Sequence, residues 1–154
     1  MTEPRLDAGV TTDIYPMPAF TTLAVADLDR TVDFYTNALD FVVLFTMPGG
    51  ALVHLRRWRY QDILVRPGDA DPGAGWTLSF SSLAEELPAL ADRARAHGGG
   101  TVDGPADTPW NTRDLTVTDP DGYRLVYTAR RPAGERDAGF EAMIRRTAAD
   151  QPGL

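Results

Sequence analysis

Trp110-Asn-Thr-Arg-Asp-Leu-Thr-Val-Thr-Asp-Pro-Asp-Gly-Tyr-Arg-Leu-Val-Tyr-Thr128 is the stretch that decides the fold. Before its centre, Leu115 and Val117 alternate with polar residues, and the alternation resumes after the centre; this two-residue period is typical of β-strands. The centre, Asp119-Pro120-Asp121-Gly122, has turn chemistry, because proline presets φ for the second turn position and Asp-Gly tolerates positive φ. The stretch therefore predicts a β-hairpin.

Composition limits the classes of protein to consider. The chain has 154 residues, of which 43% are hydrophobic and 24% charged, as expected for one ordinary globular domain with a real core. It contains no cysteine, which excludes a disulfide scaffold and thiol chemistry. No apolar run reaches the roughly 20 residues of a membrane helix, and the N-terminus lacks the apolar core of a signal peptide. We therefore expect a cytoplasmic protein with no membrane partner.

The charge of the chain also limits its partners. The formal net charge is −7, which repels phosphate backbones. The sequence has no basic stripe with interleaved aromatic residues, so we expect no nucleic-acid partner.

The hairpin ends the second of two similar patterns of elements. The first pattern is a strand, a helix that Asp27 can cap, and three strands, at 20–25, 28–39, 41–47, 51–57 and 62–66. A linker rich in proline and glycine covers 66–75. The second pattern is a strand at 76–80, a helix capped by Ser81 or Ser82 and stopped by Gly98, a short strand at 101–102, and the hairpin.

The two patterns align when the first is shifted by 55 residues. Leu23 then falls on Leu78 and Val25 on Phe80, and four apolar helix positions follow in the same register. The alignment predicts an internal duplication and an α+β fold, with tandem βαβββ units at about 19–67 and 75–129 forming curved mixed sheets with a cleft. A flexible arm at 1–18 precedes them, and an extension at 130–154 follows with a short helix.

The chain resembles the vicinal oxygen chelate superfamily, which includes glyoxalase I, extradiol dioxygenases, and fosfomycin- and bleomycin-resistance proteins. Phe34-Tyr35 and Asp119-Pro120-Asp121-Gly122 match hallmarks of that family, within the longer stretches 23–35, 110–113 and 119–125. Ala38-Leu-Asp-Phe41 departs from the usual Leu-Gly-Phe. The resemblance implies the glyoxalase/bleomycin-resistance fold.

The resemblance also implies four positions where the superfamily's enzymes hold a divalent metal. These positions are Phe20, Gly75, Val126 and Val65, or Arg66 if the register slips by one residue. Their side chains have no lone pair to offer a metal. His97, at a helix end, is interpreted as a surface or C-capping residue. We therefore expect no metal site and no cofactor.

Apolar residues at the metal positions predict an apolar pocket for a largely hydrophobic or aromatic small molecule. The two-residue period gives the pocket-facing set Phe20, Thr22, Ala24, Ile63, Val65, Gly75, Thr77, Ser79, Arg124, Val126 and Thr128. This set resembles that of the bleomycin-resistance branch, whose members bind an antibiotic without changing it. Trp110 matches a tryptophan that lines the ligand groove in that branch.

Several aromatic and basic candidates have alternative interpretations. Trp110 could stack on a ligand or only cover the sheet edge. Trp58 and Tyr60 could form a pocket lip or a dimer contact. Trp76 is expected in the core, and His54 is expected to be a structural strand residue more often than a catalyst.

Two hypotheses from different classes remain. The first is a binding protein that sequesters an antibiotic or natural product as a homodimer with two equivalent pockets, with no catalytic residues. The second is a metal-free isomerase, cyclase or hydrolase, in which His54 or Asp114 would act as general acid or base.

Overall fold

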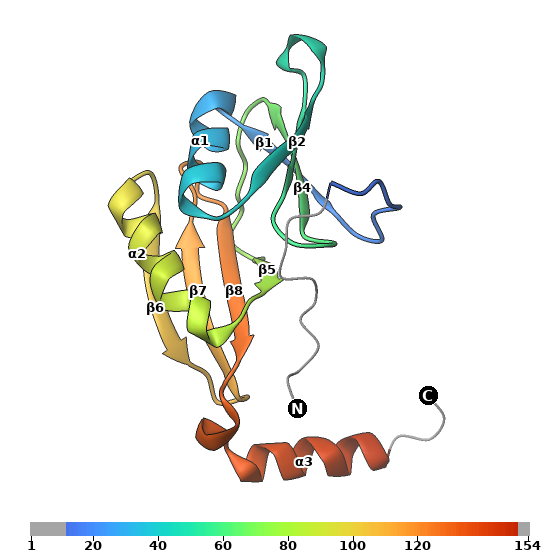
Figure 1. The fold of residues 1–154 in the computed structure, drawn as a ribbon, viewed down its shortest axis with the longest axis vertical. Coiled ribbons are helices and arrows are strands. Elements are labelled where there is room, and N and C mark those ends of the chain that lie inside the picture. The colour runs from blue at the N-terminus through green and yellow to red at the C-terminus, as the bar shows by residue number, and fades with distance from the viewer. Residues whose placement is uncertain (1–11, 151–154) are drawn as a thin grey trace.

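The computed structural model describes residues 12–150 and shows two four-stranded sheets, each with a helix on one face (Figure 1). The first unit consists of β1 (Thr21–Val25), α1 (Leu28–Ala38), β2 (Val42–Thr46), β3 (Val53–Arg56) and β4 (Asp62–Pro67). The second consists of β5 (Leu78–Ser81), α2 (Leu87–His97), β6 (Thr101–Asp107), β7 (Thr112–Thr118) and β8 (Arg124–Arg130). A further helix, α3 (Ala138–Ala149), follows.

The two sheets have the same topology. Their strand orders are β1-β4-β3-β2 and β5-β8-β7-β6. The pairs β1/β4 and β5/β8 are parallel, and the remaining pairs are antiparallel. The predicted α+β class with two mixed βαβββ sheets is therefore confirmed, and the opening hairpin is β7 and β8.

The helices α1 and α2 lie side by side against the same side of the molecule, and one core runs under both of them (Figure 1). Alternation along the strands turns Leu23 and Ile63 of the first unit and Leu125 of the second into this core. The rings of Phe41 and Phe80, one from each unit, meet edge to face with centroids 5.6 Å apart. The two units are thus packed as one body.

The predicted helix ends are partly correct. The Asp27 side chain caps α1 by accepting a hydrogen bond from Arg30 N at 2.9 Å, and Gly98 ends α2 with φ of 76°. The prediction that Ser81 or Ser82 caps the second helix is wrong, because a short 3₁₀ turn, Ala84–Glu86, separates them from α2.

Both serines instead bind the guanidinium of Arg57, a side chain only 1% exposed. Arg57 Nη1 donates to Ser81 O at 3.0 Å, and Arg57 Nη2 donates to Ser82 Oγ at 3.1 Å. The guanidinium also stacks on the ring of Trp58, 4.2 Å from its centroid. This arginine therefore ties the end of β3 to the start of the second unit.

The two family hallmarks noted in the sequence contact each other. Tyr35 Oη donates to Asp119 Oδ2 at 2.9 Å, and Asp119 Oδ1 accepts from the backbone N–H groups of Asp121 and Tyr123, each at 2.9 Å. In the opposite direction, from the second unit to the first, Tyr123 Oη donates a hydrogen bond to Ala24 O at 2.7 Å. Burial raises the pKa of the Asp119 carboxyl, although these hydrogen bonds oppose the shift.

The two ends of the described chain lie apart from the sheets' core. The segment for which a terminal helix is predicted forms α3, which extends away from the end of β8 and has no buried residue (Figure 1). Residues 12–18 pass along the first sheet, and residues 1–11 of the predicted arm lie outside the described residues. Within 12–150, no helix is long and apolar enough to cross a membrane.

We predict that Tyr35→Phe lowers the free energy of unfolding by about 1–3 kcal/mol, because the buried Asp119 carboxyl loses a hydrogen-bond donor. Urea unfolding followed by circular dichroism measures the change. Tyr60→Phe removes the same hydroxyl from a ring that is 48% exposed and should change the free energy by less than about 0.5 kcal/mol. Equal effects of the two substitutions would contradict a structural role for the Tyr35–Asp119 bond.

Candidate functional site

The first sheet has an open face, defined as the side turned away from α1. Val53 and Leu55 of β3 and Ile63 of β4 point into the core, so the alternate residues point to the open face. These alternate residues are Leu64 and three polar residues, His54, Arg56 and Asp62. Three residue types with hydrogen-bonding capacity therefore gather on one side of two neighbouring strands.

Asp62 is the centre of this group. Its side chain is 0% exposed, and Oδ1 accepts hydrogen bonds from His54 Nε2 and Arg56 Nε, both at 2.7 Å. Oδ2 accepts from Tyr15 Oη at 2.6 Å. We call Tyr15, His54, Arg56 and Asp62 the Asp62 cluster.

The Asp62 cluster favours an ionised aspartate. Burial opposes ionisation of Asp62, but the hydrogen bonds from Tyr15, Arg56 and His54 outweigh burial and lower the pKa of the carboxyl below its ordinary value. An ionised carboxylate can only accept hydrogen bonds, so His54 Nε2 carries the hydrogen of this pair. In the neutral imidazole the other ring nitrogen, Nδ1, then presents a lone pair.

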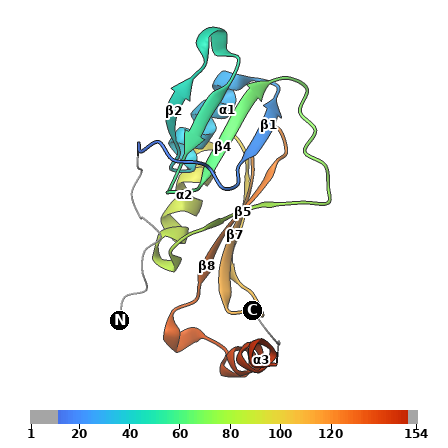
Figure 2. The same ribbon diagram turned by 90° about the vertical axis from the view of Figure 1, so that its right-hand side faces the viewer.

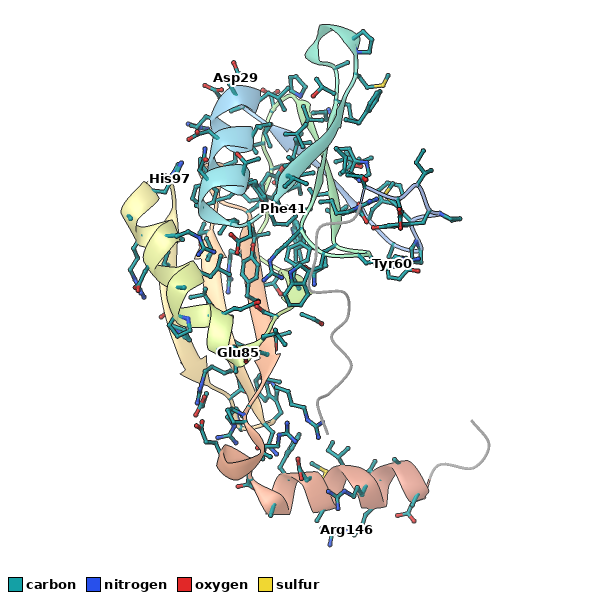
Figure 3. All side chains as sticks on the ribbon, in the orientation of Figure 1. Asp29, Phe41, Tyr60, Glu85, His97 and Arg146 are labelled. Atoms are coloured by element: carbon teal, nitrogen blue, oxygen red, sulfur yellow. The ribbon has the colours of Figure 1, made fainter. Side chains whose placement is uncertain are left out.

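Residues 12–18, which we call the arm, cross the open face of the first sheet (Figure 2). Tyr15 anchors the arm: its Oη accepts from Tyr60 N at 2.8 Å, and the Arg56 guanidinium lies 4.1 Å from its ring centroid. Arg56 Nη1 also donates to Asp13 O at 3.0 Å. Figure 3 shows Tyr60 beside this segment, at the end of the turn between β3 and β4.

The docking of Tyr15 against Arg56 and Asp62 was not predicted from the sequence. The first 18 residues were expected to form a flexible arm, and none of these three residues was expected in the site. The signal that could have found it is that Tyr15 is the only aromatic residue in that stretch. A lone tyrosine in a polar arm favours a docked segment, since its ring gains most from being buried.

Between the arm and the open face lies a cavity of about 550 Å³, which we call the arm cavity. Its apolar lining comes from Met17 of the arm and from Leu44 and Phe45 of β2. His54 and Arg56 supply polar groups at its floor. Its volume lies within the range of natural small-molecule sites.

Other predicted residues of the first unit lie elsewhere. Phe20 is 51% exposed and borders a separate cavity of about 360 Å³ beside β5. Thr22 lies in β1 opposite Leu64. Trp58 is only 9% exposed and stacks on Arg57, so the prediction of a pocket lip or dimer contact is wrong for this residue.

The prediction that Ile63 and Val65 face the pocket is wrong. Both side chains are 0% exposed and belong to the core under α1. The strand register explains the error: Ala24 pairs with Arg66, as Ser79 pairs with Val126. Ala24 and Ser79 are equivalent positions of the repeat, so Arg66 is the counterpart of Val126. The alignment of Val65 with Val126 was therefore wrong by one residue.

The second sheet's open face is polar, and the prediction of an apolar pocket there is wrong. Val126 lies on this face opposite Thr116, and its other neighbours are mainly threonines, with Arg124 at one end. Asp114 Oδ1 accepts from Thr112 Oγ1 at 2.9 Å and from Thr128 Oγ1 at 2.7 Å. Asp114, a candidate acid or base, is therefore held by two hydroxyl groups on a face separate from the arm cavity.

The remaining aromatic and small candidates are exposed. Trp110 is 55% exposed and borders a groove of about 450 Å³ with Phe140 and Ile144 of α3, so it lies in a different unit from His54. Trp76 is 40% exposed and tilts against Tyr123 at 6.0 Å, so its expected place in the core is wrong. Thr77, just before β5, is also exposed.

The residues at the superfamily's metal positions do not fit a divalent cation. With Arg66 in place of Val65, these positions are Phe20, Gly75, Arg66 and Val126. None has a side-chain lone pair that a metal could use. In the described part of the chain, no three His, Cys, Asp or Glu side chains gather in a group that could hold a metal ion.

We predict that Asp62→Asn lowers the free energy of unfolding by about 3–5 kcal/mol near neutral pH, because the buried Arg56 guanidinium loses the carboxylate that accepts from its Nε. Since the folded pKa of Asp62 lies below its ordinary value, its contribution is present above about pH 4 and is lost as the pH falls through the lowered pKa.

The measurement is urea unfolding of both proteins between about pH 6 and pH 2, in which the native protein should lose stability more steeply than Asp62→Asn. Asp69→Asn, on an exposed loop, is the matched control and should follow the native curve. Parallel curves for the native protein and Asp62→Asn would show that Asp62 is not ionised in the fold.

Comparisons with known proteins agree with this fold. The family model described as "Glyoxalase/Bleomycin resistance protein/Dioxygenase superfamily" matches residues 18–127. No curated protein sequence matches the chain.

Solved structures of low sequence identity show the same fold. FosX, a fosfomycin resistance protein from Listeria monocytogenes, has a TM-score of 0.63 and 18% identity, over 80% of this chain and 100% of its own. A bleomycin resistance determinant encoded on the transposon Tn5 has a TM-score of 0.57 and 21% identity, over 74% and 98%. TioX from Micromonospora sp. ML1 has a TM-score of 0.57 and 22% identity, over 72% and 96%. With the family model spanning both sheets, the chain belongs to the glyoxalase/bleomycin resistance protein/dioxygenase superfamily.

Proposed function

We propose that this protein binds a small, largely apolar antibiotic or natural product without a metal ion and protects by sequestering it. The observation that carries the proposal is the arm cavity, which combines apolar walls with the oriented His54 on one face of the first sheet. Sites for small molecules are mostly apolar cavities with a few well-placed polar groups, and this cavity has that composition.

Two further points support a binding role. The side chains at the superfamily's metal positions offer no donor atoms, so the metal-dependent chemistry of the superfamily has no ligand set here. The bleomycin resistance determinant and FosX, both resistance proteins by name, share this fold at low identity. Fold alone does not fix function, so the proposal depends on the cavity.

We predict that the metal-stripped protein forms a stoichiometric complex with menadione, a small, largely apolar aromatic quinone, and that the recovered compound is unchanged. Native mass spectrometry measures the complex, and chromatography measures the compound. Phe45→Ala should weaken binding about tenfold, because it removes an apolar wall of the arm cavity.

Met143→Ala, a loss of a comparable apolar side chain on α3, is the matched control and should bind the probe as the native protein does. A modified compound recovered from the metal-stripped protein would refute sequestration in favour of a metal-free enzyme. Failure to bind menadione would contradict a site for small, largely apolar molecules in the arm cavity.

We also propose that the protein works as a homodimer, with α3 in the interface. Among the residues of α3, Met143 is 41% exposed and Ile144 48% exposed, and both lie on the helix face that carries Phe140. Trp110, 55% exposed, extends this apolar surface. Apolar side chains gathered in this way favour a contact with another protein surface.

We predict that light scattering gives twice the mass of one chain and that Ile144→Glu gives the mass of a single chain, because a charge cannot be buried in an apolar interface. Ala142→Glu places the same charge on the opposite, exposed side of α3 and should leave the dimer intact. A single-chain mass for the native protein would contradict the proposal.

A further inference from the structure

We propose that the ligand of the arm cavity is an aromatic compound with an acidic hydroxyl group, and that His54 Nδ1 accepts the proton of this hydroxyl. This inference rests on the proposed binding function and names the ligand class of the same site. It is carried by the geometry of His54, Asp62 and the cavity walls.

The first step of the argument is the orientation of His54. Its Nε2 donates to the Asp62 carboxylate at 2.7 Å, which leaves Nδ1 with a lone pair. Among residues 12–150, no hydrogen bond engages Nδ1, and the side chain is 16% exposed where it borders the arm cavity. A histidine held by a carboxylate at one nitrogen has a fixed ring orientation, so the other nitrogen keeps its direction towards the cavity.

The second step is the kind of group that fits this lone pair. A ligand carboxylate is ionised near neutral pH and has no proton to donate. A ligand ammonium could donate, but it would lose its hydration in a cavity with an apolar lining. A hydroxyl is a neutral donor, and an acidic, phenol-type hydroxyl makes the strongest hydrogen bond to an imidazole.

The third step is the charge balance around His54. Asp62 and Arg56 face it from the neighbouring positions of β4 and β3, and their opposite charges compensate each other. From the arm, Tyr15 is neutral and bound to Asp62, while Asp13 adds one exposed negative charge. The β2 strand contributes only apolar residues. A proton passing from ligand to His54 thus creates an ion pair and not an isolated charge.

The fourth step is the shape of the walls. The Phe45 ring lies opposite His54 across β2 and β3 and is 51% exposed in the free protein. Met17 approaches from the arm, and Leu44 of β2 also lines the cavity. An aromatic ring held between these side chains gains apolar burial and ring contacts, and a methionine sulfur also packs well against a ring.

The step itself is a simple proton transfer. The ligand's O–H bond breaks, and an N–H bond forms at His54 Nδ1. The proton returns when the ligand leaves, so the compound is released unchanged. This outcome agrees with sequestration and requires no further reactant.

The test uses two probes that differ only in the acidic proton, 4-nitrophenol and its methyl ether 4-nitroanisole. We expect 4-nitrophenol to bind about tenfold more tightly, as a charge-assisted hydrogen bond requires. Because ionised nitrophenol absorbs in the visible range, the bound probe should show that band at a pH where the free probe is mostly neutral.

His54→Gln should remove both the visible band and the tenfold preference. His97→Gln is the matched control, since His97 pairs with Asp33 on the other side of the molecule and should change neither property. Phe45→Ala should weaken both probes equally and keep the preference. If His54→Gln fails to fold, the band and the preference of the native protein still decide the question.

Equal binding of the two probes, with no visible band, would overturn this inference and leave the proposed binding function intact. Binding of neither probe, while menadione binds, would overturn the inference alone. Binding of neither probe nor menadione would overturn both.

Discussion

The hydrogen bond from Tyr35 Oη to the buried Asp119 carboxyl connects the two halves of this protein. It joins residues 84 positions apart, in the helix of the first unit and the turn of the second. A buried carboxyl without donors would cost several kcal/mol, so the turn, Tyr35 and the backbone N–H groups around Asp119 must all be in place together. This requirement gives a physical reason why Phe34-Tyr35 and Asp-Pro-Asp-Gly occur in the same chain.

A second buried carboxylate, Asp62, has a different role because its partners differ. Asp119 is bound by neutral donors, and burial raises its pKa. Asp62 is bound by Arg56 as well as by Tyr15 and His54, and these bonds lower its pKa despite burial. The first carboxyl therefore serves the packing of the two units, whereas the second holds the arm and orients a histidine towards a cavity.

The candidate site could be predicted only in part. The strand predicted at 51–57 placed His54 on a strand, and the resemblance identified metal positions that carry no donor atoms. It placed Ile63 and Val65 on the wrong face because Ile63-Leu64-Val65 is a continuous apolar run, in which a two-residue period cannot tell one face from the other. Trp58 was misplaced because its stacking partner, Arg57, is charged and was not expected in the core.

The sequence by itself determined the local and repeated features: the hairpin, the helix with its Asp27 cap, the duplication, and hence the fold. These features depend on the spacing of apolar residues and on turn and capping residues, all of which lie close together in the sequence. Only the tertiary structure decided that Tyr15 reaches Asp62 across 47 positions and that one cavity brings His54 and Phe45 together with the arm. Such contacts join segments that are distant in the sequence. The buried Asp62 carboxylate needs hydrogen-bond donors and the Tyr15 ring gains from burial, and only the fold brings the two together.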